Sequence, residues 1–354
     1  MAFKLPVLKS KENVENAVYV VPNLCTFTWE EVKNKRRLGE GSFGDVYTGE
    51  YNGQTVVVKK TKRQTNRREM DLFIKEIRIL NELKCKNVVK VEGFCAQPLA
   101  VMLEYLYFDF QPFGIDSEPV ASLAEYLDFI VSGDYVNQLA VLQLKIAKDI
   151  TSATAHLHKN GIVHRDIKPA NILVSNKHYC SMKDTAQIAN AFRDEGIICK
   201  LADFGESRSK LNQTAKIQHT RTTNLERGTF VYNPPEIVTA NHGAASFSLE
   251  DLKRADVWSL GMVMFVLVNP DIEYPYASEL KKLNITDVSR AEEKIKSLMK
   301  VKKKPVYSEK YIALRTGTWI KIEKAFQLCA TFQPEQRPSA GEVLQTLTCV
   351  GASQ

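Results

Sequence analysis

The strongest constraint on the fold of this chain is a change of pattern along its length. The first part is mostly strand-like, with an apolar strand pattern over 99–105 and a single helical pattern over 68–83. Apolar residues then recur at helical spacing over 139–159, and helical patterns dominate from residue 249 onward. A strand-rich part that precedes a helix-rich part predicts an α+β protein, with the seam near 104–122.

Composition places the chain among globular proteins without a membrane span. Of its 354 residues, 44% are hydrophobic and 25% are charged, which is ordinary for soluble domains. The longest apolar stretch, 257–268, is too short for a bilayer, which needs about 20 residues. The first residues do not show a charged stretch followed by an apolar core, so we expect no secretory signal, and the seven scattered cysteines form no Cys-x-x-Cys pair. We therefore expect reduced thiols and a cytoplasmic location, with the nucleus as the alternative.

The net charge of +7 is mild and does not by itself indicate a nucleic-acid partner, so none is expected. Basic runs occur over 59–68 and over 294–304. Such runs are more often solvated faces than binding patches, and we expect a solvated face for both.

Residues 39–46 (Gly-Glu-Gly-Ser-Phe-Gly-Asp-Val) have glycines at a spacing that lets a backbone turn approach phosphate groups. By itself this pattern fits an ordinary hairpin turn equally well. A dinucleotide-binding turn would need a helix after the third glycine, whereas 46–49 (Val-Tyr-Thr-Gly) continues as a strand. The pattern therefore favours a glycine-rich hairpin that covers a nucleotide.

Lys59 closes an apolar strand, where an ammonium group is costly unless its charge is matched. Strand alternation puts Val57 and Lys59 on one face, beneath the glycine turn, where the ammonium can hold phosphate oxygens. The neighbouring Lys60 is expected to face solvent. Glu76, in the middle of the helix expected over 68–83, is the natural partner for Lys59, although a lone helix glutamate is more often simply solvated.

The most specific motif is 164–171, His-Arg-Asp-Ile-Lys-Pro-Ala-Asn, which resembles the catalytic loop of the eukaryotic protein kinases. Later segments resemble, in order, the metal-binding motif, the end of the activation segment, the helix that supports the catalytic loop, and the arginine that pairs with Glu236. These segments are 200–205, 228–236, 256–261 and Arg337-Pro338.

The resemblance covers nearly the whole chain and implies the two-lobed α+β protein kinase fold, with a small strand-rich N-lobe and a larger helical C-lobe. The bounds that it implies are an N-terminal extension over 1–27, a kinase domain over 28–350, an N-lobe at about 28–104, a C-lobe at about 105–350 and an insertion over 175–199. Helix formers occur around 185–192 of this insertion. We expect a tolerated surface loop, because added loop length costs little entropy, with a docking or regulatory element as the alternative.

The resemblance implies transfer of the γ-phosphoryl group of ATP, with Mg2+, to a hydroxyl of a protein substrate. Asp166 would accept or orient the proton of that hydroxyl, and Lys168 would neutralise charge on the transferred group. Asn171 and Asp203 would bind magnesium, which prefers oxygen ligands.

The resemblance also implies how the nucleotide is held. Lys59, fixed by Glu76, would hold the α- and β-phosphates, and Leu103 would be the gatekeeper beside the hinge. The other expected nucleotide contacts come from the glycine turn, the walls of the adenine site and the hinge: Leu38, Gly39, Glu40, Gly41, Ser42, Phe43, Gly44, Val46, Val57, Glu104, Leu106 and Leu173.

The acceptor is expected to be serine or threonine, because Lys168 follows the catalytic aspartate by two residues, as in the serine/threonine members. Thr229 before Tyr232 fits the same form. Residues 87–89 and 92–94 resemble the tyrosine-kinase-like branch, in which some members have dual specificity. Two alternatives remain: a pseudokinase scaffold of the same fold, and a small-molecule kinase.

Two residues depart from the family pattern, since Val57 replaces the usual alanine over the adenine and Pro235 gives Pro-Pro-Glu instead of Ala-Pro-Glu. Arg165 suggests regulation, because an arginine at this position pairs with a phosphate in the activation segment of family members. Thr222 and Thr223 are the best-placed acceptors, through an upstream kinase or trans-autophosphorylation. The alternative is that both are ordinary loop threonines.

Overall fold

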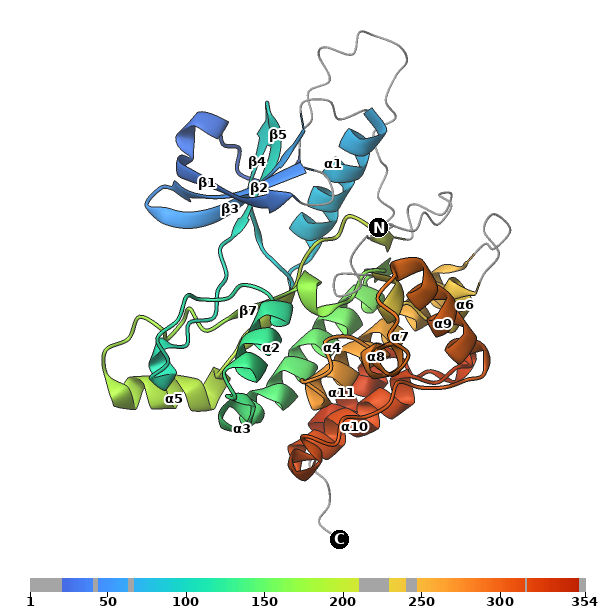
Figure 1. Ribbon diagram of the computed structural model, residues 1–354. Coiled ribbons are helices and arrows are strands. Elements are labelled where there is room, and N and C mark those ends of the chain that lie inside the picture. The colour runs from blue at the N-terminus through green and yellow to red at the C-terminus, as the bar shows by residue number, and fades with distance from the viewer. Residues whose placement is uncertain are drawn as a thin grey trace. The chain divides into compact units, whose positions relative to one another are not determined.

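The computed structural model describes residues 21–40, 44–62, 67–209, 229–239, 247–315 and 317–349, and Figure 1 shows its elements. The described chain divides into two compact units. The first contains the residues up to Arg78 together with Val91–Leu103, and the second contains Ile79–Lys90 together with the residues from Glu104 onward. The domain bounds expected from the sequence stay predictions.

The first unit is built on a five-stranded sheet in the order β1-β2-β3-β5-β4 and most of one helix, α1 (Figure 1). The end of α1 from Ile79 and the last residue of β5, Glu104, belong to the second unit. Valines at consecutive positions of β3 favour the extended chain, and α1 confirms the helix expected from its apolar face. The bounds are β1 (Lys33–Glu40), β2 (Gly44–Tyr51), β3 (Gln54–Thr61), α1 (Arg67–Glu82), β4 (Val91–Ala96) and β5 (Leu99–Glu104).

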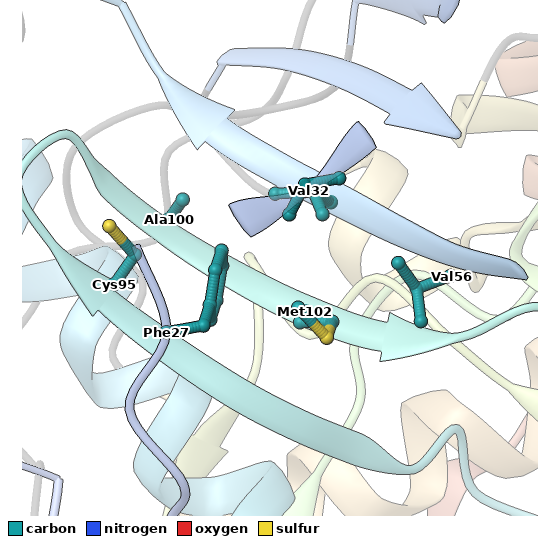
Figure 2. Packing of buried hydrophobic residues seen from close by; sticks show 7 residues of the cluster. Phe27, Val32, Val56, Cys95, Ala100 and Met102 are labelled. Carbon is teal, nitrogen blue, oxygen red and sulfur yellow. The ribbon is translucent and has the colours of Figure 1, made fainter. Parts of the chain in front are cut away.

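The segment before β1 packs with this sheet. The amide of Phe27 donates to the carbonyl oxygen of Phe94 on β4 at 3.0 Å, and the amide of Phe94 donates to the carbonyl oxygen of Cys25 at 2.8 Å. Figure 2 shows the buried cluster that results, which contains Phe27, Val32, Val56, Val58, Cys95, Ala100 and Met102. Residues 25–27, expected to belong to an extension, therefore pair with the edge of the sheet in the first unit.

The second unit is mostly helical, as the sequence predicts. Its centre is α7, which is buried along most of its length and is capped by Ser248, whose Oγ accepts a hydrogen bond from the amide of Asp251. The helices are α2 (Leu123–Ser132), α3 (Val136–Leu139), α4 (Gln143–Lys159), α5 (Thr185–Glu195), α6 (Pro235–Val238), α7 (Leu249–Val268), α8 (Ala277–Lys282), α9 (Val288–Lys300), α10 (Thr318–Cys329) and α11 (Ala340–Thr348).

The helix expected over 139–159 begins later, at Gln143, because residues 140–142 form a 3-10 turn. The carbonyl oxygen of Ala140 accepts a hydrogen bond from the amide of Gln143 and another from the indole Nε1 of Trp319 at 3.1 Å. These two bonds satisfy the carbonyl oxygen of Ala140 outside an α-helix. Within the described residues, no helix is both long and apolar enough to cross a membrane.

Two short antiparallel strand pairs lie in the second unit: β6 (Ile162–Val163) with β9 (Arg208–Ser209), and the hairpin of β7 (Ile172–Ser175) and β8 (Ile198–Leu201). The insertion leaves β7 and returns to β8, and the helix expected within it is present as α5. Its Phe192 ring packs edge-on against Phe113, with 5.5 Å between centroids, and the buried Tyr179 hydroxyl donates to the carbonyl oxygen of Gly196 at 2.5 Å. The insertion is therefore a folded part of the second unit.

An ion pair between a buried arginine and a partly buried glutamate connects α6 to the C-terminal part of the second unit. Arg337 donates through both terminal nitrogens to the carboxylate of Glu236, at 2.6 and 2.8 Å. Its guanidinium also lies over the ring of Trp258, with 5.0 Å to the centroid. Pro235 precedes Glu236 at the first position of α6, where proline suits a helix start, so Pro-Pro-Glu is compatible with the pair.

We predict that Gly44→Ala destabilises the first unit. A Cβ at residue 44 would lie 1.9 Å from the carbonyl oxygen of Lys60 on β3, so the paired strands would have to move apart. We expect a loss of about 1–3 kcal/mol of unfolding free energy. Gly39→Ala is the matched control, because a Cβ at residue 39 meets nothing within 4 Å. Equal melting temperatures for the two variants would show that the close approach at Gly44 is not required.

We predict that Glu236→Gln lowers the free energy of unfolding by about 1.5–3 kcal/mol, because a buried guanidinium loses its charged acceptor. Glu250→Gln is the control, since the side chain of Glu250 is 66% exposed in its pair with Lys253. That change is expected to stay within about 0.5 kcal/mol. Urea unfolding of both variants measures the difference, and a loss of similar size in both would contradict the prediction.

Candidate active site

The first unit brings Lys59 and Glu76 together in a buried ion pair. The Nζ of Lys59 lies 3.1 Å from Oε1 of Glu76, and the two residues are only 7% and 5% exposed. In the β2–β3 register, Lys59 lies opposite Val46, directly after the glycine turn. The matched charge explains how an ammonium group can close an apolar strand.

Lys60 corrects one expectation, because it does not simply face solvent. It is half-buried, and its Nζ lies 4.4 Å from the ring centroid of Trp29 and 5.3 Å from that of Tyr47. Because adjacent strand residues point to opposite faces, this contact leaves Lys59 on the face of Glu76. Packing therefore distinguishes the two lysines, because Lys59 pairs with Glu76 whereas Lys60 contacts aromatic rings.

The glycine turn is described only at its two ends, since Gly41, Ser42 and Phe43 lie outside the described residues. At these ends β1 and β2 pair Gly39 with Val46 and Glu40 with Asp45. A hydrogen bond from the guanidinium of Arg37 lowers the pKa of the Asp45 carboxyl, although both side chains are at the surface. Of the expected adenine contacts in this unit, Leu38 is exposed, whereas Val46 and Val57 are half-buried.

Asp256 on α7 holds the catalytic-loop motif of the second unit. Its carboxylate accepts hydrogen bonds from the main-chain amides of His164 and Arg165, at 2.8 and 2.7 Å, and contacts Nε2 of His158 at 3.0 Å. Asp256 is 1% exposed, so these bonds compensate for burying its charge. Arg165 has a φ of +72°, an unfavourable conformation for a residue with a side chain, which these contacts hold in place.

Asp166, Lys168 and Asn171 contact one another directly. Oδ2 of Asp166 lies 2.9 Å from Nζ of Lys168 and accepts a hydrogen bond from Nδ2 of Asn171 at 2.8 Å. The same Nδ2 donates to the main-chain oxygen of Asp166 at 2.8 Å. Oδ1 of Asp166 is buried and has no hydrogen-bond partner among the described residues. One carboxylate oxygen is thus fixed, and the other remains available as an acceptor.

Asp203 lies two residues after β8, whose partner β7 begins directly after Asn171. β7 and β8 pair Ile172 with Leu201, and the amide of Ala202 donates to the carbonyl oxygen of Asn171 at 2.9 Å. Asn171 and Asp203 therefore lie at the same end of this hairpin. Both carry oxygen donors of the kind magnesium prefers. The described residues contain no group of three or more His, Cys, Asp or Glu that could hold a metal ion.

His164 joins the catalytic loop to the Asp203 segment. Its Nδ1 accepts a hydrogen bond from the amide of Asp166 at 3.3 Å, and its Nε2 lies 3.1 Å from the carbonyl oxygen of Ala202. These two contacts favour the tautomer with the proton on Nε2, which can then donate to Ala202. The ring also packs edge-on against Phe204, with 4.8 Å between centroids.

Arg165 reaches the beginning of the activation segment. Its NH1 donates to the carbonyl oxygen of Glu206 at 2.9 Å and lies 3.7 Å from a carboxylate oxygen of the same residue. Thr222 and Thr223, expected to accept phosphate near this arginine, lie outside the described residues. Phosphorylation of these threonines stays a prediction.

The remaining expected nucleotide contacts, Glu104, Leu106 and Leu173, belong to the second unit. Leu106 is buried and Leu173 is half-buried. Glu104 pairs with Lys200, which was not among the expected site residues. The signal for Lys200 was present, because it is a lysine in an otherwise apolar strand, as Lys59 is. Glu206 had no comparable signal.

Comparison with known proteins identifies the family. Residues 32–347 match the model of the protein kinase domain. The chain is 29% identical to the serine/threonine-protein kinase STY46 of Arabidopsis thaliana over 274 residues, which cover 74% of this chain and 38% of that protein. It is 30% identical to the rust resistance kinase Lr10 of Triticum aestivum over 280 residues, with the same two shares, 74% and 38%.

A third relative, the wall-associated receptor kinase-like 10 of Arabidopsis thaliana, is 32% identical over 237 residues, which cover 66% of this chain and 25% of that protein. The chain thus spans well under half the length of these relatives. The domain match, together with the strand-rich first unit and the helical second unit, confirms the expected fold. The chain belongs to the protein kinase family, and its matched relatives include serine/threonine kinases.

Proposed function

We propose that this chain transfers the γ-phosphoryl group of ATP, with Mg2+, to serine or threonine hydroxyls of protein substrates. The single observation that carries the proposal is the arrangement around Asp166. Lys168 and Asn171 hold one carboxylate oxygen, while the other is buried without a partner among the described residues. A buried, unpaired acceptor is costly unless the protein uses it.

In this function, Oδ1 of Asp166 accepts the hydrogen bond of the substrate hydroxyl and orients it for in-line attack. Lys168 lies 2.9 Å from the other carboxylate oxygen, so its ammonium group is held beside the reacting hydroxyl. From there it can neutralise charge that develops on the transferred group. Asp256 positions Asp166 and Lys168 indirectly, because it fixes the main chain at His164 and Arg165 just before them.

Asn171 and Asp203 fit a magnesium site in which substrate supplies further ligands. Nδ2 of Asn171 donates to Asp166, which directs the amide oxygen elsewhere. Magnesium is commonly held by one or two protein ligands together with phosphate oxygens and water, so a larger protein cage is not needed. When bound, the ion would neutralise charge on the phosphates.

The ATP phosphates would be held in the first unit by Lys59. Its buried pair with Glu76 fixes the ammonium before the nucleotide arrives, which reduces the cost of ordering it on binding. Val46, Val57 and Leu173 are partly exposed apolar side chains suited to the faces of an adenine ring. The branch resembling tyrosine-kinase-like kinases, and a cytoplasmic or nuclear location, form part of the same proposal.

We predict that Asp166→Asn lowers the rate of phosphoryl transfer by about 100- to 10,000-fold, because an amide cannot accept the substrate proton. Asp194→Asn on the exposed side of α5 is the matched control and is expected to keep full activity. Labelled ATP and a peptide library with serine, threonine or tyrosine acceptors provide the assay. The wild-type signal should fall to background when magnesium is chelated.

The same assay separates the alternatives. A wild-type signal that does not exceed the Asp166→Asn background would favour a scaffold with the kinase fold. Phosphorylation of a small metabolite, without any protein or peptide acceptor, would favour a small-molecule kinase. Tyrosine acceptors that match serine and threonine would replace the proposed specificity with dual specificity.

We predict that joint substitution Thr222→Ala and Thr223→Ala lowers activity severalfold, because a phosphate near Arg165 would add a charge-assisted contact that orders the activation segment. Thr185→Ala at the start of α5 is the control. Activity before and after phosphatase treatment measures the effect, and activity unchanged by the joint substitution contradicts it. Dependence of phosphate uptake on protein concentration distinguishes trans-autophosphorylation from an upstream kinase.

A further inference from the structure

The carboxylate of Glu104 accepts three hydrogen bonds within the second unit. Nζ of Lys200 lies 2.7 Å from Oε1 and 2.9 Å from Oε2, and the main-chain amide of Lys90 donates to Oε1 at 2.7 Å. The amide of Glu104 in turn donates to the carbonyl oxygen of Lys90 at 3.1 Å. Both the side chain and the main chain of Glu104 are therefore fixed.

Lys200 connects Glu104 to the β7–β8 hairpin, which also carries Leu173, one of the expected adenine contacts. In the β7–β8 register, Lys200 lies directly opposite Leu173. Side chains directly opposite each other in an antiparallel pair share a face of the sheet. The ion pair thus links Glu104, at the expected hinge, to the face of the hairpin that presents Leu173.

The strand that carries Lys200 is itself held on both sides. Leu201 donates through its amide to the carbonyl oxygen of Asn87 at 2.9 Å, and its carbonyl oxygen accepts from the amide of Val89 at 2.9 Å. β7 pairs with the other edge of β8. Lys200 is consequently anchored on a strand with partners at both edges, so it can act as a fixed point for Glu104.

The burial of this pair argues for a positioning role. The side chains of Lys200 and Glu104 are 16% and 18% exposed. Exposed ion pairs contribute little, whereas a largely desolvated pair is retained at a cost and depends on good geometry. The three bonds to one carboxylate provide that geometry, and they leave the Glu104 side chain directed to protein partners instead of a nucleotide.

We propose that the Glu104–Lys200 pair is a positioning element for the adenine end of the nucleotide site. It fixes the main chain from Glu104 to Leu106 relative to Leu173, and Lys200 acts through Glu104 without contacting the nucleotide. The inference rests on the proposed function, since it assumes that ATP binds here. It assigns Glu104 a role for its side chain as well as for its main chain.

Loss of the pair is expected to weaken the binding of adenosine and of ATP equally, because the pair positions the site of the base and not that of the phosphates. Lys200→Met keeps the aliphatic stem and removes the charge. It should raise the Kd of both ligands about tenfold, because a charge-assisted hydrogen-bond pair is lost. KM for ATP should rise more than kcat falls.

The test compares Lys200→Met, Glu104→Gln and the double variant by calorimetric binding of adenosine and of magnesium-ATP. Lys177→Met, on an exposed residue just after β7, is the matched control and should bind as the wild type does. The double variant should lose less than the sum of the single losses, because both substitutions remove the same contact. Lys200→Arg should restore most of the affinity and serves if Lys200→Met does not fold.

Variants that fold and bind adenosine as tightly as the wild type would overturn the inference while leaving the proposed function intact. A loss for ATP without a loss for adenosine would also overturn it, because the effect would then concern the phosphates. Failure of the wild type itself to bind either ligand would instead remove the proposed function. Equal loss in Lys177→Met would indicate a general charge effect and contradict the inference.

Discussion

The carboxylate of Asp256 is the contact on which the candidate site in the second unit depends. It is almost fully buried on α7 and accepts hydrogen bonds from two main-chain amides of the catalytic loop. His158 is its third contact. Removing the carboxylate would leave two buried donors without partners. The buried part of α7 is otherwise largely apolar, and it carries this charge because the loop that Asp256 holds has no regular secondary structure to satisfy its own amides.

The loop residues that Asp256 holds make two further contacts, one through Arg165 and one through His164. The fixed main chain at Arg165 allows a left-handed conformation, which directs the guanidinium to Glu206. His164 links the loop to Ala202, next to Asp203. Main-chain contacts thus hold Asp166 and Asn171, and they hold Ala202 next to Asp203. In the first unit, the buried pair with Glu76 holds Lys59 in place in a similar way.

Much of the fold and site could be predicted because the relevant signals are local. Buried charges in apolar strands indicate matched partners, and the spacing of 164–171 is specific. β4 was not predicted, because Gly93 interrupts its pattern; a Cβ there would lie 3.1 Å from the ring of Phe27, a long-range contact. α2 was missed although Ser122 and Glu125 form a capping box, and the half-burial of Lys60 depends on Trp29, distant in sequence.

The pairing of residues 25–27 with β4 has a consequence for how this chain behaves when shortened. β4 is the last strand of its sheet, and its outer amides and carbonyls are partly occupied by Cys25 and Phe27. A chain begun at residue 32, where the family match starts, would lack that cover. The outer edge of β4 would then be exposed, and the space that Phe27 fills would be empty. Both changes favour strand addition by another molecule and self-association. The start of the family match and the start of the folded unit are therefore different positions in this protein.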